Sequence, residues 1–219
     1  VLVGAPKSGK TTLAEAMIFE AGLINRRGTV EEKNTVSDYH EIEHERGSSV
    51  YATSMHTEWK DYKINLIDTA VMLLNSEHGV EIGTELIWNY VEKFNKPIIF
   101  AINHLDHSKS DFDSTLEQAQ RRFGKAITVM QYPIRQGDNF DSIVDLLNMV
   151  MYKFPEKGGK PEKLPIPADE MERANQLHNE LVEKAAENDE KLMELYFEKG
   201  TLDEDQLRAG LKAGMLHHD

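Results

Sequence analysis

The sequence predicts an α/β fold: a doubly wound, mostly parallel sheet over residues 1–125, with an inserted α+β subdomain over residues 126–219. Three observations lead to this prediction. The chain opens with an apolar run, a glycine-rich turn and an amphipathic stretch, in that order. Two later apolar runs each end on polar residues, as parallel strands do at the ligand-binding edge of a sheet. The last third concentrates its carboxylates in helix-like segments, which indicates a region of different character.

The opening turn is the strongest motif. Residues 4–11 read GAPKSGKT and match the pattern G-x-x-x-x-G-K-[ST] of a phosphate-binding P-loop. The apolar residues 1–3 before it predict a strand, and apolar residues at helical spacing after it predict a helix. Strand, loop and helix are therefore in the order of a P-loop NTPase fold, and the helical positions are Leu13, Met17 and Ile18.

The chemistry of phosphate binding explains this spacing. Glycines let backbone N–H groups surround phosphate oxygens at the positive end of the following helix. Lys10 is expected to reach the outer phosphates as a catalytic-site residue, and the Thr11 hydroxyl is expected to bind Mg²⁺. The predicted nucleotide-binding residues of this loop are Gly4, Ala5, Pro6, Lys7, Ser8, Gly9, Lys10, Thr11 and Thr12.

The next strand is predicted within DYKINLIDT, residues 61–69. A nucleotide-bound Mg²⁺ in a P-loop protein needs a carboxylate from a neighbouring strand. Asp68 stands where a parallel strand would deliver that carboxylate to the ligand edge of the sheet. We therefore predict Asp68 as a second metal ligand and as a catalytic-site residue.

A third apolar run, residues 97–102, predicts a buried strand that ends on Asn103, His104, Leu105 and Asp106. This N-x-x-D pattern is similar to the N-K-x-D signature by which GTPases read guanine. A carboxylate at Asp106 can accept hydrogen bonds from guanine N1–H and the 2-amino group, whereas adenine presents a lone pair there. Asn103 is expected to bond the purine edge and to connect this loop to the P-loop. All four residues are predicted to bind the nucleotide.

With these motifs, the sequence resembles translation elongation factor G, a translational GTPase. The segment EHERGSSV, residues 43–50, is similar to the family's E-R-G-I-T-I switch segment. Residues 129–154 are similar to the stretch that opens the family's inserted subdomain, and residues 164–214 look like the helices that complete it. The resemblance covers essentially the whole chain.

The resemblance implies a GTPase that uses GTP, GDP and Mg²⁺ to drive movement of tRNA and mRNA on the ribosome. Ser49 stands where the family has a metal-binding threonine, so it joins Thr11 and Asp68 as an expected metal ligand. The implied partners are the ribosome, through its sarcin-ricin rRNA loop and its stalk protein. The implied setting is the cytoplasm, and a monomer is expected. Lys7 and His104 replace an aspartate and a lysine of the family pattern, which favours a divergent paralogue with reduced activity.

The stretch INLIDTAVMLLN, residues 64–75, lacks a connection. One apolar run ends at Asp68 and another begins at once, although parallel neighbouring strands need a crossover of about a dozen residues or more. We therefore predict that about twenty residues are absent between Thr69 and Ala70 or Val71. The resemblance implies that this segment would carry the family's water-positioning histidine. A disordered segment left out of the sequence would explain the gap, and so would a genuine deletion.

Composition limits the alternatives. A net charge of −13 argues against wrapping nucleic acid by bulk attraction, and no run approaches the roughly eighteen apolar residues of a membrane span. The absence of cysteine excludes disulfides and fits the cytoplasm. HEIEH, residues 40–44, formally matches a zinc-hydrolase motif. Besides an active translocase, a ribosome-binding factor with weak or no GTP hydrolysis and an ATP-using phosphotransferase remain open.

Overall fold

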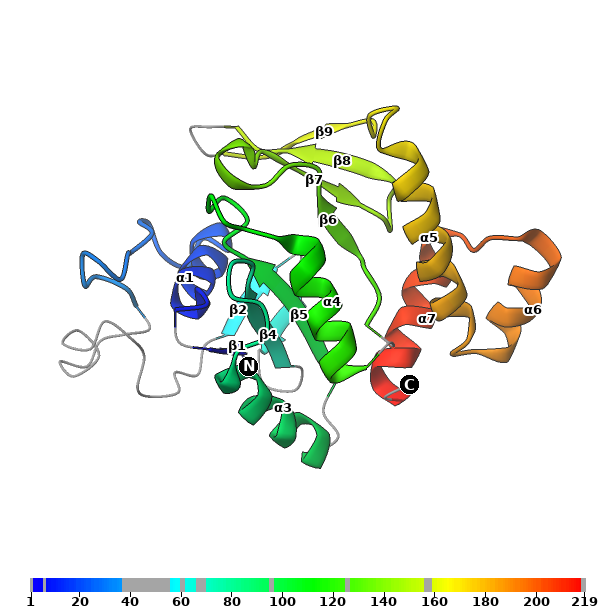
Figure 1. Cartoon of the computed structure of the whole chain (residues 1–219), viewed down its shortest axis with the longest axis horizontal. Helices are drawn as coiled ribbons and strands as arrows, with labels where there is room; N and C mark the ends of the chain where they lie inside the picture. Colours follow the sequence, from blue (N-terminus) through cyan, green and yellow to red (C-terminus); the bar gives the residue numbers. More distant parts are fainter. Residues whose placement is uncertain are drawn as a thin grey trace. The chain divides into compact units, whose positions relative to one another are not determined.

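The computed structural model divides the chain into two compact units, Val1–His104 and Leu105–Asp219 (Figure 1). The predicted domain boundary lies further along, after residue 125. The structure describes residues 2–5, 7–36, 56–59, 62–65, 70–94, 97–124, 127–155 and 159–217.

A parallel three-stranded sheet organises the first unit. Strands β1 (Leu2–Gly4), β4 (Ala70–Asn75) and β5 (Ile98–Asn103) lie in the order β1-β4-β5, with β4 in the middle. The side chains of Met72, Leu73 and Leu74 in β4 are 0–1 % exposed. A continuous apolar run is typical of a strand covered on both faces of a parallel sheet, and β4 therefore forms the core of this unit.

Two helices follow the strands of this sheet. Helix α1 (Lys10–Glu20) packs against β1, and helix α3 (Ile82–Phe94) packs against β1 and β4. In α1 the buried side chains include Ala14 and Ile18, one turn apart, as the helical spacing predicts. In α3 only Thr84 is buried among the described side chains, and four large apolar residues at every fourth position are exposed: Ile82, Leu86, Tyr90 and Phe94.

The strands on either side of Asp68 do not pair with each other in the described structure. Strand β3 (Tyr62–Asn65) pairs antiparallel with β2 (His56–Trp59), and residues 66–69 lie outside the described residues. The expectation that the two runs form neighbouring parallel strands is therefore wrong. The reason is that a strand has only two edges, and both edges of β4 are occupied, by β1 and by β5.

The full 219-residue sequence passes directly from Thr69 to Ala70. The missing crossover is therefore absent from the sequence itself.

The second unit contains, in its described residues, an antiparallel sheet and four helices. The sheet has the order β6-β7-β8-β9. The elements are β6 (Gln131–Pro133), η1 (Gly137–Asn139), β7 (Ser142–Asp145), β8 (Val150–Lys153), β9 (Glu162–Leu164), α4 (Phe112–Phe123), α5 (Met171–Ala186), α6 (Glu190–Lys199) and α7 (Glu204–His217).

Helix α5 packs against both α6 and α7. Leu181 in α5 and Leu207 in α7 are 0 % and 1 % exposed and contribute to this core. Gly210 permits a close approach, because a Cβ added there would collide with the backbone carbonyl of Ala185. These contacts form an apolar core between α5 and α7.

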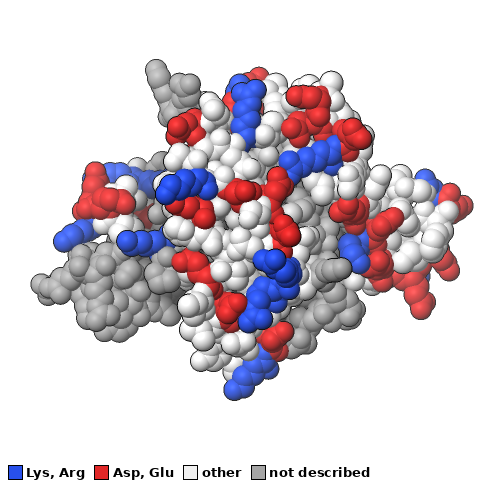
Figure 2. All heavy atoms as spheres, viewed as in Figure 1, with Lys and Arg blue, Asp and Glu red and all other residues white. Residues whose placement is uncertain are grey.

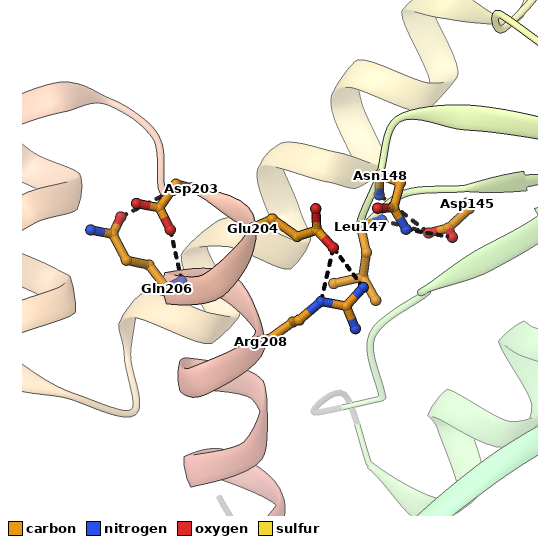
Figure 3. A network of polar contacts seen from close by, with 7 residues as sticks. All are labelled: Asp145, Leu147, Asn148, Asp203, Glu204, Gln206 and Arg208. Carbon is orange, nitrogen blue, oxygen red and sulfur yellow. Dashed lines mark hydrogen bonds and ion pairs between the residues drawn. The ribbon is translucent and has the colours of Figure 1, made fainter. Parts of the chain in front are cut away.

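Polar contacts fix the start of α7 (Figure 3). The Asp203 carboxylate accepts a 2.9 Å bond from the Gln206 N–H, while the Gln206 side chain accepts from the Asp203 N–H at 3.0 Å. This reciprocal pair is a capping box. One turn on, Arg208 binds Glu204 through Nε and Nη2, and this bond raises the pKa of the guanidinium. The beginning of α7 is therefore specified locally.

On the face drawn in Figure 2, carboxylates alternate with lysines and arginines. No contiguous basic patch covers the described part of that face. Within the residues described, none of the helices has the length and apolar character needed to cross a membrane.

Candidate functional site

The loop between β1 and α1 has a glycine at each end, and both glycines have positive φ angles that other residues rarely adopt. Gly4 has φ 145° and Gly9 has φ 92°. A Cβ added at Gly4 would lie 2.5 Å from the Leu73 carbonyl oxygen of β4 and 2.8 Å from Ser8 Oγ. Because real Cβ atoms do not approach other atoms that closely, glycine is required where the end of β1 lies beside Leu73 of the central strand.

Lys10 folds back over this loop from the first position of α1. Its Nζ donates hydrogen bonds of 3.0 Å to the Gly4 carbonyl and 2.8 Å to the Ala5 carbonyl. The N-cap residue Gly9 supplies no side-chain acceptor, and the first turn contains no acidic residue. The amino end of α1 thus combines an ammonium group with the positive end of the helix dipole, which suits an anion such as phosphate.

Ser8 carries a buried hydroxyl group that has no hydrogen-bond partner in the described part of the chain. Its side chain is 0 % exposed, and its Oγ makes no hydrogen bond among the described residues. Buried hydroxyl groups are nearly always bonded in native structures. An orphaned hydroxyl inside a glycine loop fits a site whose ligand supplies the missing partner.

The end of β5 closes on the same loop. Asn103 Nδ2 donates a 3.0 Å hydrogen bond to the Ser8 carbonyl, and His104 Nε2 lies 3.1 Å from the Lys7 carbonyl, to which its N–H donates. Ser76, which follows β4, donates from Oγ to the His104 carbonyl at 2.8 Å. Hydrogen bonds therefore connect the end of β5 to the glycine loop and the residue after β4 to the end of β5.

Some of the other predicted site residues lie in the described part of the chain, and others lie outside it. Ala5 is 2 % exposed in the loop, and Thr11 and Thr12 lie in the first turn of α1. Leu105 and Asp106 open the second unit, after β5 and His104. Pro6, Ser49 and Asp68 lie outside the described residues, as do residues 40–44 of the zinc-like motif.

The expected metal ligands are only partly described. Thr11 is the one expected Mg²⁺ ligand in the described part of the chain. Within that part, no group of three or more histidine, aspartate and glutamate residues could hold a metal ion by itself. Hydroxyl groups and phosphate oxygens are ligands that Mg²⁺ accepts, so Thr11 fits a metal that is held together with a nucleotide.

Sequence reasoning missed two residues of this region. Ser76 has a side chain 2 % exposed and bonds both Asn103 and His104. Glu15 is completely buried on α1. The sequence could have indicated that Glu15 is buried, because this charged residue lies on the same helical face as Ile18. No comparable pattern marks Ser76, whose contact forms only when β4 and β5 pair.

Comparisons with known proteins agree with this geometry. The family described as the elongation factor Tu GTP binding domain matches residues 1–70 and 67–198. Elongation factor G from Granulibacter bethesdensis is 31 % identical over 230 residues, covering 95 % of this chain and 33 % of that protein. A crystal structure of a Thermus thermophilus protein has a TM-score of 0.89 and 25 % identity, covering 98 % of this chain and 35 % of that one.

The chain thus spans about a third of the length of the elongation factor G that it matches. The two family matches overlap at residues 67–70, which include the direct step from Thr69 to Ala70. Since 95 % of 219 residues is about 208, about 22 of the 230 matched positions have no counterpart in this chain.

The predicted fold class is confirmed: the chain has the P-loop NTPase α/β fold, with a mostly parallel sheet and an α+β addition. The family match covers more than half of the chain and includes the glycine loop, the Asn103 contact and the antiparallel sheet of the second unit. The chain belongs to the elongation factor Tu GTP-binding domain family, the G domain of the translational GTPases.

Proposed function

We propose that this chain is the GTP-binding part of an elongation factor G-like ribosomal translocase, which couples GTP binding and hydrolysis to movement of tRNA and mRNA. The observation that supports this most strongly is the glycine loop held by Asn103 at the end of β5. That contact joins a phosphate-binding element to the start of the guanine-reading motif within one compact unit.

The proposed roles follow from the chemistry of each group. Lys10, now bonded to two loop carbonyls, is placed to exchange them for phosphate oxygens. Ser8 Oγ is a hydrogen-bonding group available to the same phosphates. Asp106 selects guanine through N1–H and the 2-amino group. Mg²⁺, when bound with GTP or GDP, would neutralise phosphate charge, and its proposed protein ligands are Thr11, Ser49 and Asp68.

The sequence lacks one residue that the family uses for GTP hydrolysis. Lys10 and Asp68 are proposed as residues of the catalytic site. The segment missing between Thr69 and Ala70 is where the family carries its water-positioning histidine. This absence favours a second candidate function, a ribosome-binding translocation factor with weak or no GTP hydrolysis.

The partners and setting are proposed from the family. The ribosome is the expected partner, through the sarcin-ricin rRNA loop and the stalk protein. The protein is expected to act in the cytoplasm as a monomer, without a membrane. We also propose that the nucleotide-binding domain extends to residue 125, because α4 follows β5 in the order of a strand–helix unit.

Two measurements on the longest polypeptide that contains this chain test the proposal. Calorimetric titration should detect GTP and GDP, with ATP much weaker. Failure to bind guanine nucleotide, or a preference for ATP, would contradict the proposed function. Turnover of GTP with and without ribosomes then separates the two candidates: strong stimulation supports the active translocase, and none supports the binding factor.

A further inference from the structure

Asp106, the residue proposed to read guanine, lies in an exposed loop, residues 105–111, that precedes α4. Its side chain makes no hydrogen bond or ion pair with the described residues. No side-chain contact therefore fixes the direction of the carboxylate within that part of the chain. Its position depends instead on the backbone of the loop, and on the groups that hold this backbone.

The carbonyl of Leu105, the residue before Asp106, accepts two hydrogen bonds. The Gly137 N–H donates to it at 2.8 Å and the Ser110 hydroxyl at 3.0 Å. The Gly137 N–H also donates to Ser110 Oγ at 3.1 Å, so the three groups bond one another. The Leu105 carbonyl belongs to the planar peptide group that joins Leu105 to Asp106. Two donors on this carbonyl therefore restrict the orientation of the peptide group from which Asp106 starts.

The other end of the loop is held by the side chain of Gln136. Its Oε1 accepts a 2.6 Å hydrogen bond from the N–H of Phe112, the first residue of α4. The next residue, Gly137, is buried and has φ 70°, which glycine adopts without strain. Two consecutive residues, Gln136 and Gly137, thus bond the two ends of the loop that contains Asp106.

The groups that hold this loop come from the antiparallel sheet of the second unit. Gln136 and Gly137 lie between its strands β6 and β7, and all of these contacts are within the second unit. Accurate placement matters for a base-reading carboxylate, because hydrogen bonds weaken steeply when their distance or angle departs from the optimum. A carboxylate that accepts from guanine N1–H and the 2-amino group together must satisfy two such geometries at once.

We propose that Ser110 and Gln136 are positioning residues that hold Asp106 for guanine recognition, so that base selectivity depends on the segment between β6 and β7. The ligand in this proposal rests on the proposed function. Phosphate binding belongs to the glycine loop and to Lys10, which these two residues do not contact in the described structure. Their loss should therefore change the choice of base more than the affinity for phosphate.

Calorimetric titration of the longest polypeptide containing this chain with GDP and with inosine diphosphate tests the proposal. Inosine diphosphate differs from GDP only in lacking the 2-amino group, so it loses one hydrogen bond to Asp106. The wild type should bind GDP at least about tenfold more tightly, because this bond is made to a charged acceptor. In Ser110→Ala and in Gln136→Ala this ratio should fall at least about threefold, since a displaced carboxylate bonds the 2-amino group poorly.

Matched variants control for the residue type and for the lost atoms. Ser108→Ala in the same loop and Gln131→Ala on β6 change exposed residues of the same two types, and both should keep the wild-type ratio. Ser110→Thr keeps a hydroxyl group and Gln136→Glu keeps an acceptor oxygen, so both should retain most of the selectivity. Gln136→Met, which keeps the length of the side chain without the oxygen, replaces the alanine variant if that variant does not fold.

The possible failures are distinguishable. If the wild type does not bind GDP, both the proposed function and the positioning role are overturned. If it binds GDP and inosine diphosphate equally well, the 2-amino group is not read, and the positioning role is overturned while nucleotide binding stands. A purely structural role for Ser110 and Gln136 would lower both affinities by the same factor. An unchanged ratio in their variants therefore rejects the positioning role alone.

Discussion

The side-chain amide of Asn103 donates a 3.0 Å hydrogen bond to the backbone carbonyl of Ser8, across 95 positions of sequence. The contact forms because β4 pairs with β1 on one edge and with β5 on the other, which brings the carboxyl ends of the strands together. It turns two separate motifs into one arrangement, since Asn103 begins the N-x-x-D pattern and Ser8 lies in the glycine loop.

Asn103→Ala should weaken guanine nucleotide binding without unfolding the protein. The substitution leaves the Ser8 carbonyl without its donor and removes the group that packs over Gly9. A neutral hydrogen bond contributes about 1 kcal/mol, so we expect roughly a fivefold loss of GDP affinity in calorimetric titration. Asn139→Ala, at an exposed position of η1, is the matched control. Equal affinities for the two variants would reject a role for the Asn103 contact.

Gly4→Ala should destabilise the first unit strongly. The added Cβ would meet the Leu73 carbonyl oxygen of the central strand, which is backbone and cannot rotate away. Gly22→Ala is the matched control, because Gly22 also has a positive φ, of 73°, but no atom lies within 4 Å of the added Cβ. Backbone strain alone costs about 1 kcal/mol.

Thermal unfolding of the two glycine variants measures the difference. Gly4→Ala should lower the melting temperature clearly more than Gly22→Ala. If both variants melt at the same temperature, the close approach between the loop and β4 does not exist in solution.

Asp106→Asn should change the preferred base. The aspartate can accept from guanine N1–H and the 2-amino group, whereas an asparagine amide would donate one bond and accept the other. That pattern suits xanthine, which has a carbonyl in place of the 2-amino group. Hydrogen bonds to charged groups contribute about 1.5–3 kcal/mol, so GTP affinity should fall roughly tenfold or more. Competition between GTP and xanthosine triphosphate is the measurement, and an unchanged preference for GTP would show that Asp106 does not read the base.

Tyr132→Phe should remove a pH dependence of stability in the second unit. Burial of the ring, which is 1 % exposed, raises the pKa of Tyr132, and the Glu170 carboxylate that accepts its hydrogen bond at 3.1 Å raises the pKa further. The neighbouring Arg173 guanidinium acts on this pKa in the opposite direction.

The sign of the effect follows from the raised pKa. The folded state holds the Tyr132 proton more tightly than the unfolded chain does, so its contribution to stability is present below the unfolded pKa of about 10 and is lost as pH rises above that value. Denaturant unfolding between about pH 8 and pH 11 should show a steeper alkaline loss in the wild type than in Tyr132→Phe. Tyr90→Phe, on an exposed face of α3, controls for loss of a hydroxyl. Parallel curves for wild type and Tyr132→Phe would contradict the prediction.

Local patterns in the sequence were sufficient to predict the strands, the loop and the helix that carry the site. Residues 4–11 specify a glycine loop between a strand and a helix because positive φ angles and helical spacing are encoded within a few neighbouring residues. The run before Asn103 likewise identified β5. The direct step from Thr69 to Ala70 was also visible, but the assumption that the flanking runs are parallel neighbours was wrong, because β3 pairs with β2.

Contacts between distant segments required the tertiary structure. The sequence did not indicate that β4 would occupy the middle of the sheet, that β3 would pair with β2, or that Glu15 would bond both ends of residues 28–36. Strand edges pair and carboxylates become buried only when segments far apart in the chain meet, and no short stretch contains both partners. Periodicity and steric rules thus determined the elements and their chemistry, whereas long-range packing decided which of them share an edge, a hydrogen bond or a site.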